Sequence, residues 1–177
     1  MGSLGPNPAR TLVEAVTAFF ERQQQAASCV TATVLVGRGY YPAPDPFTMA
    51  FGSGDTRLGR NGEYLLRVRH GYRFARAEVA QRGWLVVTTS YEYQLMDRAE
   101  RMILTYHCHP SGRSPVTAPH LHVGCRVPLG DFAKVHLPTG HVSLPAVIQM
   151  TINELGVEPL RPDWDAVLSR AERELAG

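Results

Sequence analysis

Four of the seven histidines in this chain form two His-x-His pairs within the segment Tyr106–Gly124. The pairs are His107 with His109 and His120 with His122. Side chains two residues apart on a strand project to the same face, about 6.5–7 Å apart. Two neighbouring strands that each carry such a pair would bring four imidazoles together. The spacing therefore favours a functional site over isolated surface histidines.

Three interpretations of this histidine cluster compete. Neutral imidazoles are good ligands for zinc and other divalent transition metals, and the ligands would then be His107, His109, His120, His122 and the carboxylate of Glu92. Alternatively, one protonated and one neutral histidine act as acid and base at a phosphodiester without a metal. The third interpretation is that the histidines only make hydrogen bonds on a solvated sheet. Acid–base catalysis is slightly favoured, because no Cys or Asp shares the expected face.

The basic residues offer candidates for contact with phosphate. Seven arginines lie in the range 57–82, and Lys134 is the only lysine of the chain. Guanidinium groups bind phosphate in a bidentate manner, although a GC-rich genome produces the same bias towards arginine. Arg126 shares the expected histidine face, and Arg67 and Arg69 are expected to extend the phosphate contact. A net charge of +2 excludes a strong overall attraction to nucleic acid.

The segments that carry these residues alternate between apolar and polar positions, which indicates half-buried strands. On the apolar face we expect Leu85, Val87, Tyr91, Tyr93, Leu95, Met102, Leu104, Tyr106, Cys108, Leu121, Val123, Cys125 and Val127. Glu92 and all four paired histidines then lie on the opposite, wetter face. The pattern predicts an antiparallel meander from Glu63 to Val127.

Three helices are expected to cover the apolar face of this sheet. The first follows the Asn7-Pro8 pair, the second begins after Ser143 and ends at Gly156, and the third begins near Asp163. The order of elements predicts one α+β domain over residues 1–177, with one sheet face covered by an N-terminal helix and two C-terminal helices. A further strand is expected over 29–37. The Pro- and Gly-rich range 38–61 is expected to be a long loop, either a lid or an insertion.

Three histidines lie outside the two pairs. His70 directly precedes Gly71 and is expected at the end of a strand. His136 and His141 flank a Pro-Thr-Gly turn, which we expect mainly to position the cap residue Ser143. A fifth metal ligand or an anion-binding turn is the alternative function for these two histidines.

Composition predicts a soluble, cytoplasmic protein. The chain is 44% hydrophobic and 19% charged, which is ordinary for a globular domain. It has no apolar run of membrane-spanning length and no apolar signal-peptide region at the N-terminus. Cys29, Cys108 and Cys125 form no CxxC motif and leave one cysteine over, so reduced thiols are expected. The sequence does not determine an oligomeric state.

The stretch SYEYQLMDRAERMILTYHCHP, with APHLHVG and a Ser-Leu-initiated helix after it, resembles the small TumE-like toxins of bacterial and archaeal toxin–antitoxin modules. The resemblance covers about residues 62–150, and the matching positions are Tyr91, Tyr93, Asp97, His107, His109, Pro119, His120 and His122. It implies a toxin-like protein that acts on RNA and is encoded beside a partner protein.

The leading hypothesis is therefore an RNA-directed nuclease. His120 and His122 would form its centre, with His107 or His109 as the complementary acid or base. The alternative is a non-catalytic binding subunit of a defence or regulatory complex, in which the histidines hold a structural metal or line a recognition surface. A mononuclear metallohydrolase that uses Glu92 for proton transfer is the third hypothesis.

Overall fold

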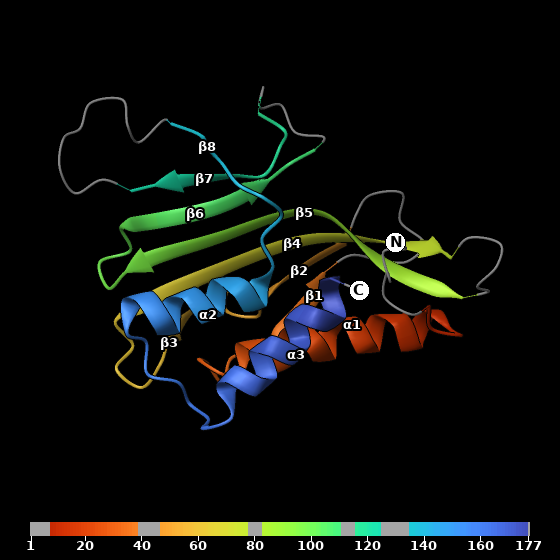
Figure 1. Ribbon diagram of the computed structural model, residues 1–177, viewed down its shortest axis with the longest axis horizontal. Coiled ribbons are helices and arrows are strands. Elements are labelled where there is room, and N and C mark those ends of the chain that lie inside the picture. The colour runs from red at the N-terminus through yellow and green to blue at the C-terminus, as the bar shows by residue number, and fades with distance from the viewer. Residues whose placement is uncertain (1–7, 39–46, 78–82, 111–115, 125–134, 177) are drawn as a thin grey trace.

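The computed structural model describes residues 8–38, 47–77, 83–110, 116–124 and 135–176. It contains an eight-stranded antiparallel sheet with three helices (Figure 1). The strands are β1 (Leu35–Arg38), β2 (Phe47–Phe51), β3 (Asp55–Leu58), β4 (Tyr64–Arg76), β5 (Trp84–Asp97), β6 (Met102–Cys108), β7 (His120–Val123) and β8 (Leu137–Pro138). The helices are α1 (Leu12–Ala27), α2 (Leu144–Leu155) and α3 (Trp164–Ala176). The predicted α+β class is confirmed.

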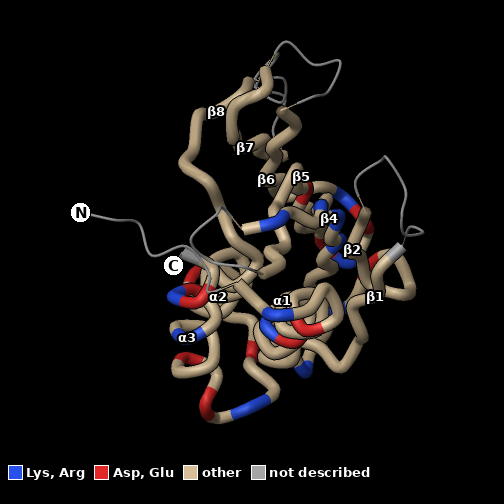
Figure 2. Tube along the Cα trace, turned by 90° about the vertical axis from the view of Figure 1, so that its right-hand side faces the viewer, with Lys and Arg blue, Asp and Glu red and all other residues tan. Residues whose placement is uncertain are grey.

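The order of strands is β1-β2-β4-β5-β6-β7-β8, and β3 pairs with the first part of β4. The three helices pack against the apolar face of the sheet around β2, β4 and β5, where Phe19, Val68, Tyr93, Ile148 and Leu168 are buried in one core. Strands β6, β7 and β8 extend beyond the helical layer in both views of the chain (Figures 1 and 2). The strands that carry the paired histidines therefore lie at the margin of the core.

Local capping residues set the ends of the helices. Thr11 accepts a hydrogen bond from the backbone N–H of Glu14, whose side chain in turn accepts one from the Thr11 N–H, so α1 begins later than the Asn7-Pro8 pair predicted. Ser143 caps α2, as predicted, by accepting from the backbone N–H of Ala146. Gly156 ends α2 in the left-handed conformation, with φ of +69°, which glycine adopts without strain.

A β-bulge in β5 overturns part of the expected face assignment. The register of β4 on β5 shifts directly after Gly71, which leaves Thr89 without a partner in the ladder. Because side chains alternate along a strand, the extra residue transfers Leu85 and Val87 to the face opposite Tyr91. The prediction that these three side chains share one face is therefore wrong.

Three further expectations about the strands are wrong. The range 38–61 is not a continuous loop, because Phe47–Phe51 and Asp55–Leu58 form β2 and β3, although 39–46 lies outside the described residues. The strand expected over 29–37 starts only at Leu35, since residues 28–30 form a turn after α1. His70 does not end a strand, because β4 continues through Gly71 to Arg76.

Gly124 gives a direct test of the packing of β7 against β6. A Cβ atom at this position would lie 1.9 Å from the carbonyl oxygen of Met102, while the Gly124 N–H donates to the carbonyl of Ile103 at 2.7 Å. We expect Gly124→Ala to lower the free energy of unfolding by about 2 kcal/mol, because the backbones must separate. Gly140→Ala is the control, since nothing lies within 4 Å of its Cβ position. Equal urea midpoints for the two variants would contradict this packing.

Candidate metal centre

Two rows of facing residues cross the outer face of the sheet, opposite the helices. The first row, from β4 to β7, is Arg69, Glu92, His107 and His120, and the second is Arg67, Gln94, Thr105 and His122. Directly opposed residues of antiparallel strands share a face, with Cβ atoms about 4.5–5.5 Å apart. His109 lies two positions after His107 and projects to the same side. The strand register thus brings both predicted histidine pairs and Glu92 together.

The ligand atoms of these side chains are close enough to share an ion. The Nε2 atoms of His120 and His122 lie 3.1 Å apart. Nε2 of His107 contacts Nε2 of His109 and lies 3.3 Å from a carboxylate oxygen of Glu92. Among the described residues, two sets have all ligand atoms within 4.8 Å of one another, His107 with His120 and His122, and Glu92 with His107 and His109. His107 belongs to both sets.

The most buried of these histidines has its tautomer fixed by the backbone. His120 is 3% exposed, and its Nδ1 lies 2.7 Å from the carbonyl oxygen of Ala118. A carbonyl only accepts, so Nδ1 carries the proton and Nε2 presents a lone pair towards His122. A histidine that binds a metal commonly donates its second ring N–H in this way. In a tetrahedral zinc site, ligand nitrogens about 2.0–2.1 Å from the ion are separated by about 3.3 Å, close to the spacing observed here.

Burial favours the neutral form of two of these imidazoles, His107 and His122. It lowers the pKa of His107 to about 4, and the neighbouring His109 lowers it further while Glu92 opposes the change. Burial also lowers the pKa of His122, with additional contributions from His136 and His120. Neutral imidazole is the form that binds a metal, whereas an acid–base pair requires one of the two histidines to be protonated. For His107 and His122, the lowered pKa therefore favours metal binding over a role as the acid in metal-free catalysis.

A fifth histidine joins the cluster from the segment before β8. The ring centroid of His136 lies 4.9 Å from that of His120 and 4.6 Å from that of His122. A fifth metal ligand was only the alternative prediction for His136, because the sequence pattern did not indicate that β8 pairs with β7. His141, in contrast, packs its ring against Tyr91, with 4.9 Å between centroids, on the helix-covered face.

The three predicted phosphate ligands differ in their positions. Arg69 is exposed and faces Glu92 across the ladder, in the row that contains His107. Arg67 lies on the same face but forms an ion pair with Asp55 at 3.1 Å and donates to Gln94. Arg126 lies outside the described residues. Figure 2 shows basic segments gathered around β4. Since Arg69 is exposed and shares a row with Glu92 and His107, it is the best-placed cation of the described outer face.

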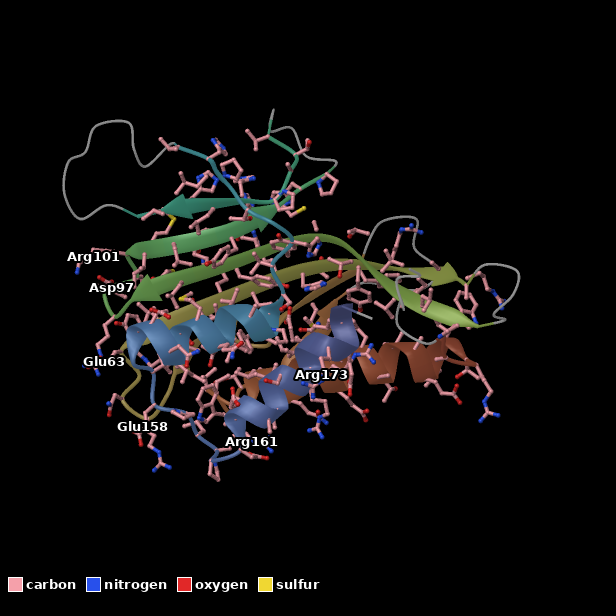
Figure 3. The ribbon with its side chains drawn as sticks, in the orientation of Figure 1. Glu63, Asp97, Arg101, Glu158, Arg161 and Arg173 are labelled. Atoms are coloured by element: carbon pink, nitrogen blue, oxygen red, sulfur yellow. The ribbon has the colours of Figure 1, made fainter. Side chains whose placement is uncertain are left out.

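Three positions of the TumE-like pattern lie away from the cluster formed by His107, His109, His120, His122 and His136. Tyr91 and Tyr93 are buried in the core, with their rings stacked at 5.1 Å. Asp97 is the last residue of β5 and lies beside Arg101 (Figure 3), and the two side chains form an ion pair at 2.7 Å. Hydrogen bonds from Arg101 lower the pKa of Asp97 to about 2. Asp97 therefore stabilises the β5–β6 turn.

One buried group at the site was not singled out in the sequence. Thr105 faces both Gln94 and His122, is 7% exposed, and its hydroxyl has no hydrogen-bond partner among the described residues. The burial of Thr105 at this site could not be predicted from the sequence, because threonine is common in sheets.

In a comparison with known proteins, no protein-family model, curated protein or solved structure matches the chain. Within the described ranges, no helix has both the length and the apolar character needed to cross a membrane.

Proposed function

We propose that this protein is a metal-dependent phosphodiester hydrolase, with a divalent transition metal such as zinc bound by His107, His120 and His122. The main support for the proposal is that ligand nitrogens of these three residues lie within 4.8 Å of one another on the outer face of the sheet. The backbone-fixed tautomer of His120 and the lowered pKa values of His107 and His122 support it.

A metal held by three histidines supplies an activated water and polarises the bond to be cleaved. Glu92 lies in the same row, and its carboxylate oxygen is 3.3 Å from Nε2 of His107. We assign Glu92 the task of accepting the proton of the attacking water. His120, fixed by the Ala118 carbonyl, keeps Nε2 directed at the centre throughout.

The position of Arg69 and the resemblance to TumE-like toxins both support RNA as the proposed substrate. Arg69 lies two strands from His107, so their Cα atoms are about 10 Å apart at about 4.8 Å per strand. A guanidinium on that side chain can reach a phosphate held above Glu92. The resemblance to TumE-like toxins supports RNA as the substrate and an antitoxin-like protein as a partner in the cytoplasm.

Metal-free catalysis, with His120 or His122 as one member of the acid–base pair and His107 or His109 as the other, has less support. The Nε2 atoms of His120 and His122 are 3.1 Å apart, so these two cannot flank a phosphate, and the second group must come from the other pair. The lowered pKa values of His107 and His122 also disfavour the protonated imidazole that must act as the acid.

A structural metal in a non-catalytic binding subunit is the second candidate, and one specific observation favours it. The ring of His136 lies against both His120 and His122, and a rotation of that side chain would add a fourth ligand to the set His107, His120 and His122. A metal with four protein ligands has no open position for water, and its main effect is stability. His136→Ala separates the candidates: a closed site loses metal affinity, whereas an open catalytic site retains it.

The test is cleavage of labelled single-stranded RNA by the purified protein with and without EDTA. We expect EDTA to abolish cleavage, added zinc or manganese to restore it, and the His120→Ala/His122→Ala double variant to remain inactive with metal. Cleavage that survives EDTA but disappears in the double variant would instead favour metal-free acid–base catalysis. Intact RNA together with metal-dependent stabilisation would favour the structural metal.

Arg69 is expected to act on the substrate and not on the metal. Replacing it with glutamine removes a charge-assisted contact worth about 1.5–3 kcal/mol, so kcat/KM for RNA should fall about 10- to 100-fold. Zinc affinity should remain unchanged. Arg73→Gln is the matched control, because Arg73 is also exposed on β4 but lies four residues further along the strand. Equal losses in the two variants would show a general charge effect instead.

A further inference from the structure

A second site lies on the helix-covered face of the sheet. A cavity of about 260 Å³ lies between the sheet and parts of α1, α3 and the start of α2. Its polar lining includes Gln23 of α1, His70 and Thr88 and Tyr93 of the sheet, and Glu172 of α3. Because the histidine cluster occupies the outer face, the two sites are on opposite sides of the sheet.

Gln23 provides the strongest indication that the cavity takes a ligand. The residue is 1% exposed, and its side-chain oxygen Oε1 has no hydrogen-bond partner among the described residues. Leaving a buried acceptor unpaired is unfavourable, and nearly all such groups in native proteins have a partner. A hydrogen-bond donor inside the cavity would satisfy Gln23.

The other polar groups of the cavity set its charge. His70 uses both ring nitrogens, at 2.8 Å from the hydroxyl of Tyr93 and 2.9 Å from that of Thr88. Burial lowers its pKa to about 4, so it is neutral at neutral pH. Glu172 accepts a hydrogen bond from the Ser143 hydroxyl through Oε2, and its Oε1 makes no hydrogen bond to a described residue. The imidazole of His141 also lines the cavity, which thus offers a neutral acceptor at Gln23 and an anionic acceptor at Glu172.

We propose that this cavity binds a small organic cation, with a primary ammonium that donates to Gln23 and Glu172. Leu144 and Leu175 provide an apolar wall for the body of the ligand. The volume is below the roughly 300 Å³ at which pockets for drug-sized molecules begin, so the ligand is of fragment size. The site is independent of the proposed hydrolase centre, and either proposal can fail alone.

Benzylamine is a suitable probe, with benzyl alcohol and benzoate as neutral and anionic molecules of similar shape. Calorimetric titration should show millimolar binding of benzylamine and much weaker binding of the other two. Glu172→Gln should weaken benzylamine binding about tenfold, because the charge-assisted contact is lost while the hydrogen bond to Ser143 is retained. Glu174→Gln, an exposed position on the same helix, should leave binding unchanged.

Gln23→Met separates a ligand-binding role from a structural one. Methionine fills the same volume without a buried acceptor, so the melting temperature should rise by about 2–4 °C while benzylamine affinity falls. Absence of benzylamine binding to the wild type would overturn the proposal. So would equal binding of benzoate, or binding that survives both Glu172→Gln and Gln23→Met.

Discussion

Replacing His120 with alanine should lower the zinc affinity of the chain at least about a hundredfold and abolish metal-dependent RNA cleavage. Loss of outer hydrogen-bond partners alone commonly costs 10- to 100-fold in metal affinity, and removal of a ligand should cost at least as much. Among the three proposed ligands, His120 is the most buried and has its tautomer fixed by the Ala118 carbonyl. It is therefore the ligand that solvent can replace least well.

Competition with a chromophoric chelator measures this affinity directly. His141→Ala is the control, because the His141 ring packs against Tyr91 on the helix-covered face and lies outside the cluster. Circular dichroism of the metal-free proteins should show equal strand content, since β7 keeps its backbone ladder to β6 and β8. Wild-type zinc affinity in His120→Ala would remove this residue from the metal centre.

The second large effect concerns acid stability, which should depend on His70. This residue is buried between Phe19 and Tyr93, and burial lowers its pKa from 6.5 to about 4, with a smaller contribution from His141. Below pH 6.5 the unfolded chain takes up a proton at His70 that the folded chain does not, so stability falls as pH falls. The loss should be complete near pH 4 and amount to about 3 kcal/mol.

His70→Gln tests this assignment, because glutamine keeps polar atoms near Tyr93 and Thr88 but does not titrate. Urea unfolding of both proteins between pH 7 and pH 4 should show a weaker pH dependence for the variant. Other titrating groups, including His107 and His122, contribute to both proteins and cancel in the comparison. Parallel pH curves would mean that His70 does not control acid stability.

The positions of the paired histidines followed from local pattern alone. Because side chains alternate along a strand, His107 and His109 had to share one face, and so did His120 and His122. The cluster then formed because β6 and β7 are antiparallel neighbours. The helix caps at Ser143 and Gly156 were predictable for the same reason, since both depend on residues within one turn.

Features that depend on tertiary pairing were not predictable. The bulge at Thr89 reversed the faces of Leu85 and Val87, because one unpaired residue in a regular pattern leaves no sequence signal. Gly71 suggested the end of a strand, yet β4 continues through it. The contact of His136 with the cluster depends on β8 pairing with β7 at the end of a connection that has no periodicity.

The coordination of zinc in the purified protein tests the central claim most directly. X-ray absorption of the zinc-loaded protein should show one bound zinc with three imidazole nitrogens at about 2.0–2.1 Å. The same measurement on His122→Ala should show one imidazole fewer or no bound zinc. A zinc shell without imidazole, or an identical spectrum for the wild type and the variant, would contradict a metal centre built from His107, His120 and His122.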